Sequence, residues 1–249
     1  MRTAFVSSRA AAAPGESFAI ALRQKIAMGW HTYWRNPGDS GAPTTIDWQL
    51  PAGIKASPID WPIPKALPYG ALVNYGYKGD TLLPLTIEVG RDAKPGPAVL
   101  KAHVSWLVCA DVCVPQDADL TLTVNIAPAG TDDPAWAGKI AAARAALPEK
   151  AGLMSGLKRE GEAYMLNASG PALAGARKPY FFPFEADKID HAAPQPGAIE
   201  NGAARLTLTP SVIGNIAKGP LAGLLTFETQ KDGVWSRRAI EISTQANPP

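Results

Sequence analysis

The sequence has few cysteines, few histidines and little charge. It holds two cysteines, three histidines and 18% charged residues in 249, with a net charge of +2. No block of Lys or Arg is present, so nucleic-acid binding has little support. No Ser/His/Asp set, paired-carboxylate pattern, phosphate loop or zinc-ligand spacing occurs. No apolar run reaches about 18 residues, as a membrane-spanning helix would need, and the N-terminus lacks the basic and apolar regions of a secretory signal.

Glycine and proline, by contrast, are abundant. The 23 glycines and 24 prolines are scattered between short apolar runs, as turn residues are in an all-β protein. Lys231-Asp232-Gly233 predicts a hairpin turn between two such runs. The expected strands cover residues 16–28, 45–50, 81–89, 99–108, 119–126, 164–168, 180–184, 204–209, 224–229 and 234–242, with a further aromatic strand starting at Gly29.

One helix is expected between two β-rich halves. The Ala-rich stretch 136–147 can be capped by Asp132 or Asp133, and Pro148 ends it. The prediction is an all-β chain of two β-sandwich domains joined by this helix. The domains are residues 1–130, with both cysteines, and residues 150–249, and the helical linker covers residues 131–149.

The segment 69–80 is predicted to be a loop between strands, because it is rich in Gly and Tyr. It includes Asn74, Tyr75, Gly76 and Tyr77. Tyrosines on such a loop can present flat, partly apolar surfaces to a neighbour, but these two residues taken alone are more typical of turn positions.

The two cysteines stand four residues apart, where an apolar strand ends. Residues four apart in an extended strand are about 13 Å apart, too far for a disulfide. The residues between Cys109 and Cys113 must therefore turn tightly if the pair is to bridge. Chain entropy in so short a loop would contribute only about 2 kcal/mol, and a pair in a small turn is easily reduced and re-formed. The pattern leaves open a redox-active pair, a structural disulfide or a metal site.

A metal site would need a histidine besides the two thiolates. His31 or His103 could complete a set that suits a soft ion such as Cu(I). A single histidine in a strand is more often a surface residue or a hydrogen-bonded core residue. The tryptophans at positions 30, 34, 48, 61 and 106 are likewise more typical of core packing.

Two stretches resemble a known family. Gly29-Trp-His-Thr-Tyr-Trp-Arg-Asn-Pro-Gly-Asp-Ser-Gly41, followed by Trp48-Gln-Leu-Pro-Ala-Gly53 and Trp61-Pro62, resembles the N-terminal periplasmic domain of the DsbD-type thiol:disulfide interchange proteins. Val104-Ser-Trp-Leu-Val-Cys-Ala-Asp-Val-Cys-Val-Pro115 resembles it too. The longer form, with a second β domain and Tyr180-Phe-Phe-Pro183, is similar to the ScsB branch, which is linked to copper tolerance.

The resemblance implies an immunoglobulin-like fold and a redox role for Cys109 and Cys113. In this family a membrane domain passes electrons from cytosolic thioredoxin to a thioredoxin-like domain, which reduces the N-terminal pair. That pair then reduces oxidised periplasmic partners, usually through its second cysteine, here Cys113. A loop shields the pair in the family, and Asn74-Tyr75-Gly76-Tyr77 matches it by position and character. The acidic residues that often precede the aromatic are absent here.

We therefore expect the periplasmic segment of a membrane-anchored protein-disulfide reductase. The reaction would use the two thiols and neither cofactor nor metal: Cys113 attacks the partner's disulfide and Cys109 resolves the mixed disulfide. The expected partners are the thioredoxin-like domain of the same full-length protein and a periplasmic disulfide isomerase or reductase of thioredoxin fold. The alternatives are a Cu(I)-binding module using both thiolates and a histidine, and an adhesion-type sandwich with an inert disulfide.

Overall fold

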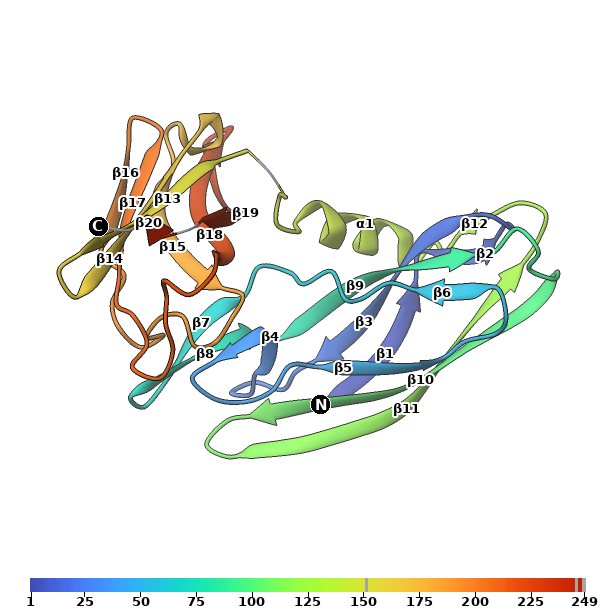
Figure 1. The fold of residues 1–249 in the computed structure, drawn as a ribbon. Helices are drawn as coiled ribbons and strands as arrows, with labels where there is room; N and C mark the ends of the chain where they lie inside the picture. Colours follow the sequence, from blue (N-terminus) through green and yellow to red (C-terminus); the bar gives the residue numbers. More distant parts are fainter. Residues whose placement is uncertain (151, 245, 248–249) are drawn as a thin grey trace. The chain divides into compact units, whose positions relative to one another are not determined.

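A computed structural model describes residues 1–150, 152–244 and 246–247 (Figure 1). The chain divides into two compact units. The first contains Met1–Arg35, Gly41–Pro64 and Gly76–Leu147, and the second contains Asn36–Ser40, Lys65–Tyr75 and the chain from Pro148 on. Among the described residues, no helix is both long and apolar enough to cross a membrane.

The first unit is built from two sheets. One has the strand order β1 (Arg2–Ser7), β3 (Ser17–Lys25), β9 (Asp80–Val89) and β6 (Ile54–Ala56). The other has the order β12 (Thr131–Asp132), β2 (Arg9–Ala12), β11 (Cys113–Ile126), β10 (Gly96–Cys109) and β5 (Thr45–Gln49). Figure 1 shows β10 and β11 as one long antiparallel hairpin.

The core of the first unit follows from period-two alternation in its strands. Leu100, Val104 and Trp106 of β10 are buried, whereas Lys101 between them is exposed. Phe5 of β1 stacks on Trp48 of β5 with 4.8 Å between ring centroids, so the rings join strands of the two sheets. Burial of each large apolar side chain stabilises such a core by about 1.5–3 kcal/mol.

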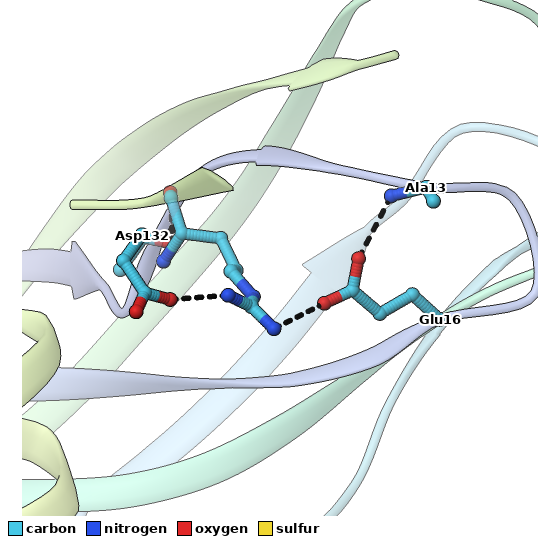
Figure 2. Close-up of polar contacts among 5 residues, drawn as sticks. Ala13, Glu16 and Asp132 are labelled. Atoms are coloured by element: carbon cyan, nitrogen blue, oxygen red, sulfur yellow. Dashed lines mark hydrogen bonds and ion pairs between the residues drawn. The ribbon is translucent and has the colours of Figure 1, made fainter. Parts of the chain in front are cut away.

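The N-terminal strand β2 is tied to its neighbours by ion pairs. The guanidinium of Arg9 forms ion pairs with the carboxylates of Glu16 and Asp132, which are labelled in Figure 2. The other carboxylate oxygen of Glu16 accepts a hydrogen bond from the backbone N–H of Ala13 at 2.9 Å. One charged cluster therefore holds β2, the turn after it and the short strand β12 together.

The single α-helix among the described residues, α1 (Ala137–Ala145), belongs to the first unit and lies against β3 and β9. Its one buried residue, Ile140, packs against Val6 and Ala21. The side chain of Asp133 accepts hydrogen bonds from the backbone N–H groups of Ala135 and Trp136, in the turn before the helix. The helix predicted from the Ala-rich stretch is therefore present, though shorter than residues 136–147.

The second unit has its own pair of sheets and its own core. One sheet has the order β16 (Gly197–Glu200), β17 (Ala203–Leu208), β14 (Ala163–Ser169), β13 (Met154–Glu160) and β20 (Ala246–Asn247), and the other has β15 (Arg177–Pro183), β18 (Leu221–Lys231) and β19 (Val234–Thr244). A short 3-10 helix, η1, covers Pro171–Leu173. Leu166 and Leu206 from the first sheet pack in one cluster with Phe227 and Ile240 from the second. The predicted all-β, immunoglobulin-like fold class is thus confirmed. The assignment of separate domains to residues 1–130 and 150–249, with a linker over 131–149, stays a prediction.

A fifth sheet among the described residues has three strands. Its order is β4 (Thr32–Gly38), β8 (Leu72–Tyr77) and β7 (Lys65–Tyr69). The predicted loop over residues 69–80 is therefore wrong for most of its length. Gly76 is not a turn glycine: a Cβ there would lie 1.9 Å from the carbonyl oxygen of Thr32, so glycine is needed for close approach of two strands.

Candidate redox site

The β10–β11 hairpin brings the two cysteines together. Fourteen antiparallel residue pairs run along it, from Gly96 opposite Ile126 to Cys109 opposite Cys113 at the tip. Residues 110–112 form the turn, and the cysteine Cα atoms are 4.1 Å apart. Cys109 and Cys113 form a disulfide. The tight turn that the four-residue spacing requires is confirmed.

The two sulfur-bearing residues differ in exposure. Cys109 is 1% exposed, whereas Cys113 and the turn residues Asp111 and Val112 are exposed. Val114, which follows Cys113, is also exposed. A molecule that approaches from solvent therefore meets Cys113 and an apolar rim, and not Cys109.

Cys109 is held from the opposite side by the segment before β4. The backbone N–H of His31 donates to the carbonyl oxygen of Cys109 at 2.9 Å, and the N–H of Cys109 donates to the carbonyl oxygen of His31 at 3.0 Å. This isolated antiparallel bridge places both side chains on the same face. The tip of the hairpin is thus fixed to an element some 78 residues earlier in the chain.

A tyrosine hydroxyl contacts the disulfide. The O–H of Tyr33, in β4, donates a hydrogen bond to Sγ of Cys109 at 2.8 Å and lies 3.5 Å from Sγ of Cys113. Tyr33 is itself 1% exposed. Tyr33 lies within the aromatic motif of residues 29–41, but the motif predicts no role for it. Its approach to the sulfurs depends on a contact that pattern alone does not reveal.

The histidines lie in different surroundings. His31 is buried, which lowers its pKa, and the charge of Lys78 lowers that pKa further. Its Nε2 has no hydrogen-bond partner among the described residues. His103 lies further along β10, where its Nδ1 is 2.9 Å from a carboxylate oxygen of Asp119, and this hydrogen bond raises its pKa. Within the described part of the chain, no three His, Cys, Asp or Glu side chains form a group that could hold a metal.

The four residues predicted to cover the pair belong to strand β8 and are buried. The side chain of Asn74 accepts a hydrogen bond from the hydroxyl of Ser40 at 2.9 Å. The hydroxyl of Tyr75 lies 3.0 Å from Nδ1 of His191, and that of Tyr77 donates to the carbonyl oxygen of Pro62 at 2.8 Å. The role of Asn74, Tyr75, Gly76 and Tyr77 as a cover stays a prediction.

A small cavity lies beside the hairpin tip. Its volume is about 260 Å³, and it is lined by Met1, Ala27, Trp30, Val108, Val114 and Gln116. Val108 and Val114 are opposite each other in the hairpin, one pair before the cysteines. Apolar side chains therefore adjoin the disulfide on the strands that carry it.

A disulfide between one buried and one exposed cysteine, at the tip of a hairpin in an immunoglobulin-like sandwich, is a site suited to thiol–disulfide exchange. The family described as "Thiol:disulfide interchange protein DsbD, N-terminal" matches residues 2–125. The chain thus belongs, through this segment, to the DsbD N-terminal family, and membership implies an oxidoreductase role in thiol–disulfide exchange.

Solved structures extend the likeness over the second unit. The N-terminal periplasmic domain of ScsB from Proteus mirabilis is 18% identical, with a TM-score of 0.64, and the match covers 94% of this chain and 90% of that one. The periplasmic chaperone SfaE is 10% identical over 99% of this chain and 100% of that one, with a TM-score of 0.27. No curated protein sequence matches the chain.

Proposed function

We propose that the chain is the periplasmic electron-relay segment of a membrane-anchored disulfide reductase. It would accept reducing equivalents from a thioredoxin-like domain of the same full-length protein. It would pass them to oxidised periplasmic proteins, such as a disulfide isomerase or reductase of thioredoxin fold. The observation that carries the proposal is the unequal exposure of the disulfide, with Cys109 buried and Cys113 open to solvent.

This asymmetry supports separate roles for the two sulfurs. In the reduced protein, the Cys113 thiolate attacks the disulfide of the oxidised partner and forms a mixed disulfide. The Cys109 thiolate then attacks Sγ of Cys113, which releases the partner as a thiol and re-forms the Cys109–Cys113 bond. The partner gains two electrons and two protons, and the cysteine pair loses them. The exposed rim at Val112 and Val114 offers apolar contact area for the partner.

Matched cysteine variants test this proposal. Cys109→Ala keeps the attacking thiol but removes the resolving one, so it should accumulate a mixed disulfide with an oxidised thioredoxin-like protein. Cys113→Ala keeps only the buried thiol and should accumulate at least about tenfold less, because thiol–disulfide exchange requires access to the sulfur. Non-reducing electrophoresis with mass spectrometry measures both products. Equal trapping by the two variants, or none by either, would contradict the assigned roles.

The likeness to ScsB extends the proposal to copper tolerance. We propose that loss of the relay sensitises cells to copper because periplasmic disulfides are then not reduced. A strain lacking the full-length protein should regain growth in copper with the natural chain and not with the Cys109→Ala/Cys113→Ala variant. Restoration of growth by that variant would show that copper tolerance does not require the two thiols, and would contradict the proposal.

A further inference from the structure

We propose that Tyr33 is a catalytic residue of the exchange reaction: its hydroxyl stabilises Cys109 as the leaving thiolate and so directs attack onto Cys113. The inference rests on the proposed function for its biological setting, but its chemistry needs only a thiol reductant. It starts from one contact, the 2.8 Å hydrogen bond from the hydroxyl of Tyr33 to Sγ of Cys109.

The surroundings hold the hydroxyl at this position before any reaction begins. Gly41 has φ +102°, and a Cβ at this residue would lie 2.3 Å from the ring of Tyr33, so the ring occupies space that only glycine leaves open. The ring of His31 meets that of Tyr33 edge to face, with 5.1 Å between centroids. His31 is also the residue whose backbone binds Cys109. Donor and sulfur are thus positioned by the same short segment.

The hydrogen bond should strengthen as the reaction proceeds. A disulfide sulfur is a weak acceptor, whereas a thiolate carries a full negative charge and accepts a charge-assisted hydrogen bond. Tyr33 and Cys109 are each 1% exposed, so water competes little for either group. A donor fixed where charge develops stabilises the transition state more than the ground state, and this difference accelerates the reaction.

The electrons can be followed through both steps. A thiolate of a dithiol reductant attacks Sγ of Cys113, an S–S bond forms between them, and the Cys109–Cys113 bond breaks. Its electron pair goes to Sγ of Cys109, which leaves as the thiolate that Tyr33 binds. The second thiol of the reductant loses its proton to solvent and attacks the reductant's first sulfur, which releases Cys113 as a thiolate. The reductant becomes a disulfide, and two protons from solvent complete the reduced pair.

The test is Tyr33→Phe, which keeps the ring and removes the hydroxyl. Reduction of the disulfide by dithiothreitol, followed by acid quench and alkylation, should slow by about tenfold, in line with a lost hydrogen bond to a charged group. In a Cys113→Ser background, the pKa of the Cys109 thiol should rise, because a donor to the thiolate has been removed. An unchanged rate together with an unchanged thiol pKa would overturn the proposal.

Thr32→Val is the matched control. Thr32 is a buried neighbour in β4 whose hydroxyl donates to Oε1 of Gln24 at 2.9 Å, so this variant also loses a buried hydroxyl from the strand. It should leave the reduction rate and the thiol pKa unchanged. If Tyr33→Phe fails to fold, a fluorinated tyrosine at position 33 provides a stronger donor and should shift both readouts the other way. No shift with it would also overturn the proposal.

These measurements use a small reductant and need no protein partner. A failed mixed-disulfide experiment with Cys109→Ala would therefore remove the relay function and leave the role of Tyr33 standing. Conversely, normal trapping combined with an unaffected Tyr33→Phe variant would preserve the relay and remove Tyr33 from its chemistry.

Discussion

At the scale of the residue, the two halves of one disulfide have different surroundings. Cys109 has its backbone bound by His31 and its sulfur bound by Tyr33, whereas Cys113 lies at the exposed start of β11. The disulfide therefore joins a buried cysteine to an exposed one. The spacing of the two cysteines in the sequence does not indicate which of them is buried.

Gly41 should be intolerant of any side chain. Gly41→Ala is expected to destabilise the first unit by about 1–3 kcal/mol through overpacking against the ring of Tyr33, besides about 1–2 kcal/mol for its left-handed backbone. Gly29→Ala is the control: its φ is +83°, but nothing lies within 4 Å of an added Cβ. Urea unfolding of both variants measures the difference, and equal losses would show that the ring contact costs nothing.

At the scale of the element, the alternating strands are the part of the fold that sequence predicts best. The expected strands at 16–28, 81–89 and 99–108 correspond to β3, β9 and β10, because each has one buried face. The predicted hairpin turn is confirmed too: Asp232 and Gly233 have φ +50° and +79°, and Lys231 pairs with Val234. Two central residues with positive φ give the type I′ turn that matches strand twist.

Strand β8 cannot be predicted from its own residues, because they are buried by residues far away in the sequence. Its glycine and tyrosines are typical of a loop in sequence, yet Tyr75 is fully buried and packs edge to face on Phe182, with 4.8 Å between ring centroids. Phe182 comes from β15, more than 100 residues later. Periodicity within six residues could not predict that packing.

Tyr75→Ala should therefore destabilise the second unit by about 3–5 kcal/mol, the usual cost of removing a buried aromatic side chain. Tyr69→Ala is the control, since Tyr69 is 41% exposed, and surface substitutions usually cost less than about 0.5 kcal/mol. Chemical unfolding gives both values, and a small loss for Tyr75→Ala would contradict its structural role.

The predicted cover of the cysteine pair, residues Asn74–Tyr77, can be tested by the rate at which thiols of different size reduce the disulfide. If Asn74–Tyr77 shields the disulfide, Tyr77→Ala should raise the rate at which a bulky thiol reduces the pair more than the rate with a small thiol. An equal change in both rates would contradict the predicted cover and would indicate that the segment contributes only to stability.

At the scale of the whole molecule, the chain divides into two units that are not continuous in sequence. Segments Asn36–Ser40 and Lys65–Tyr75 belong to the second unit, although they precede most of the first. In the second unit, Asn36 donates a hydrogen bond from its side chain to the carbonyl oxygen of Pro183 at 2.8 Å. A boundary placed at one helix by composition could not reveal such segments.

Stability should fall on acidification in both units. Burial lowers the pKa of His31 in the first unit and of His191 in the second below the ordinary 6.5. The unfolded chain therefore binds more protons, so the stabilisation is present above about pH 6.5 and is lost as pH falls through each folded-state pKa. Urea unfolding at pH 7.5, 6.5 and 5.5, with hydrogen exchange to assign each unit, measures this trend.

Variants identify the groups responsible for that trend. His31→Gln should flatten the pH dependence of the first unit only, and His191→Gln that of the second only. His103→Gln should make the stability of the first unit fall more steeply as pH decreases. The hydrogen bond to Asp119 raises the pKa of His103 and stabilises its charged form at low pH, and this variant removes that bond. An unchanged slope in both His31→Gln and His191→Gln would contradict the burial argument.

Alternation, turn residues and cysteine spacing act over a few residues. The all-β class, the strands of the β10–β11 hairpin and the cysteine pair at their junction can therefore be predicted from the amino-acid sequence. The burial of Cys109, the hydrogen bond from Tyr33 to its sulfur and the burial of strand β8 cannot be predicted in this way. Those features depend on contacts between residues far apart in the chain: Tyr33 and Cys109 are 76 positions apart, and Tyr75 and His191 are 116. The periodicity of a single strand cannot predict such a contact, because the contact depends on how the strands pack against one another.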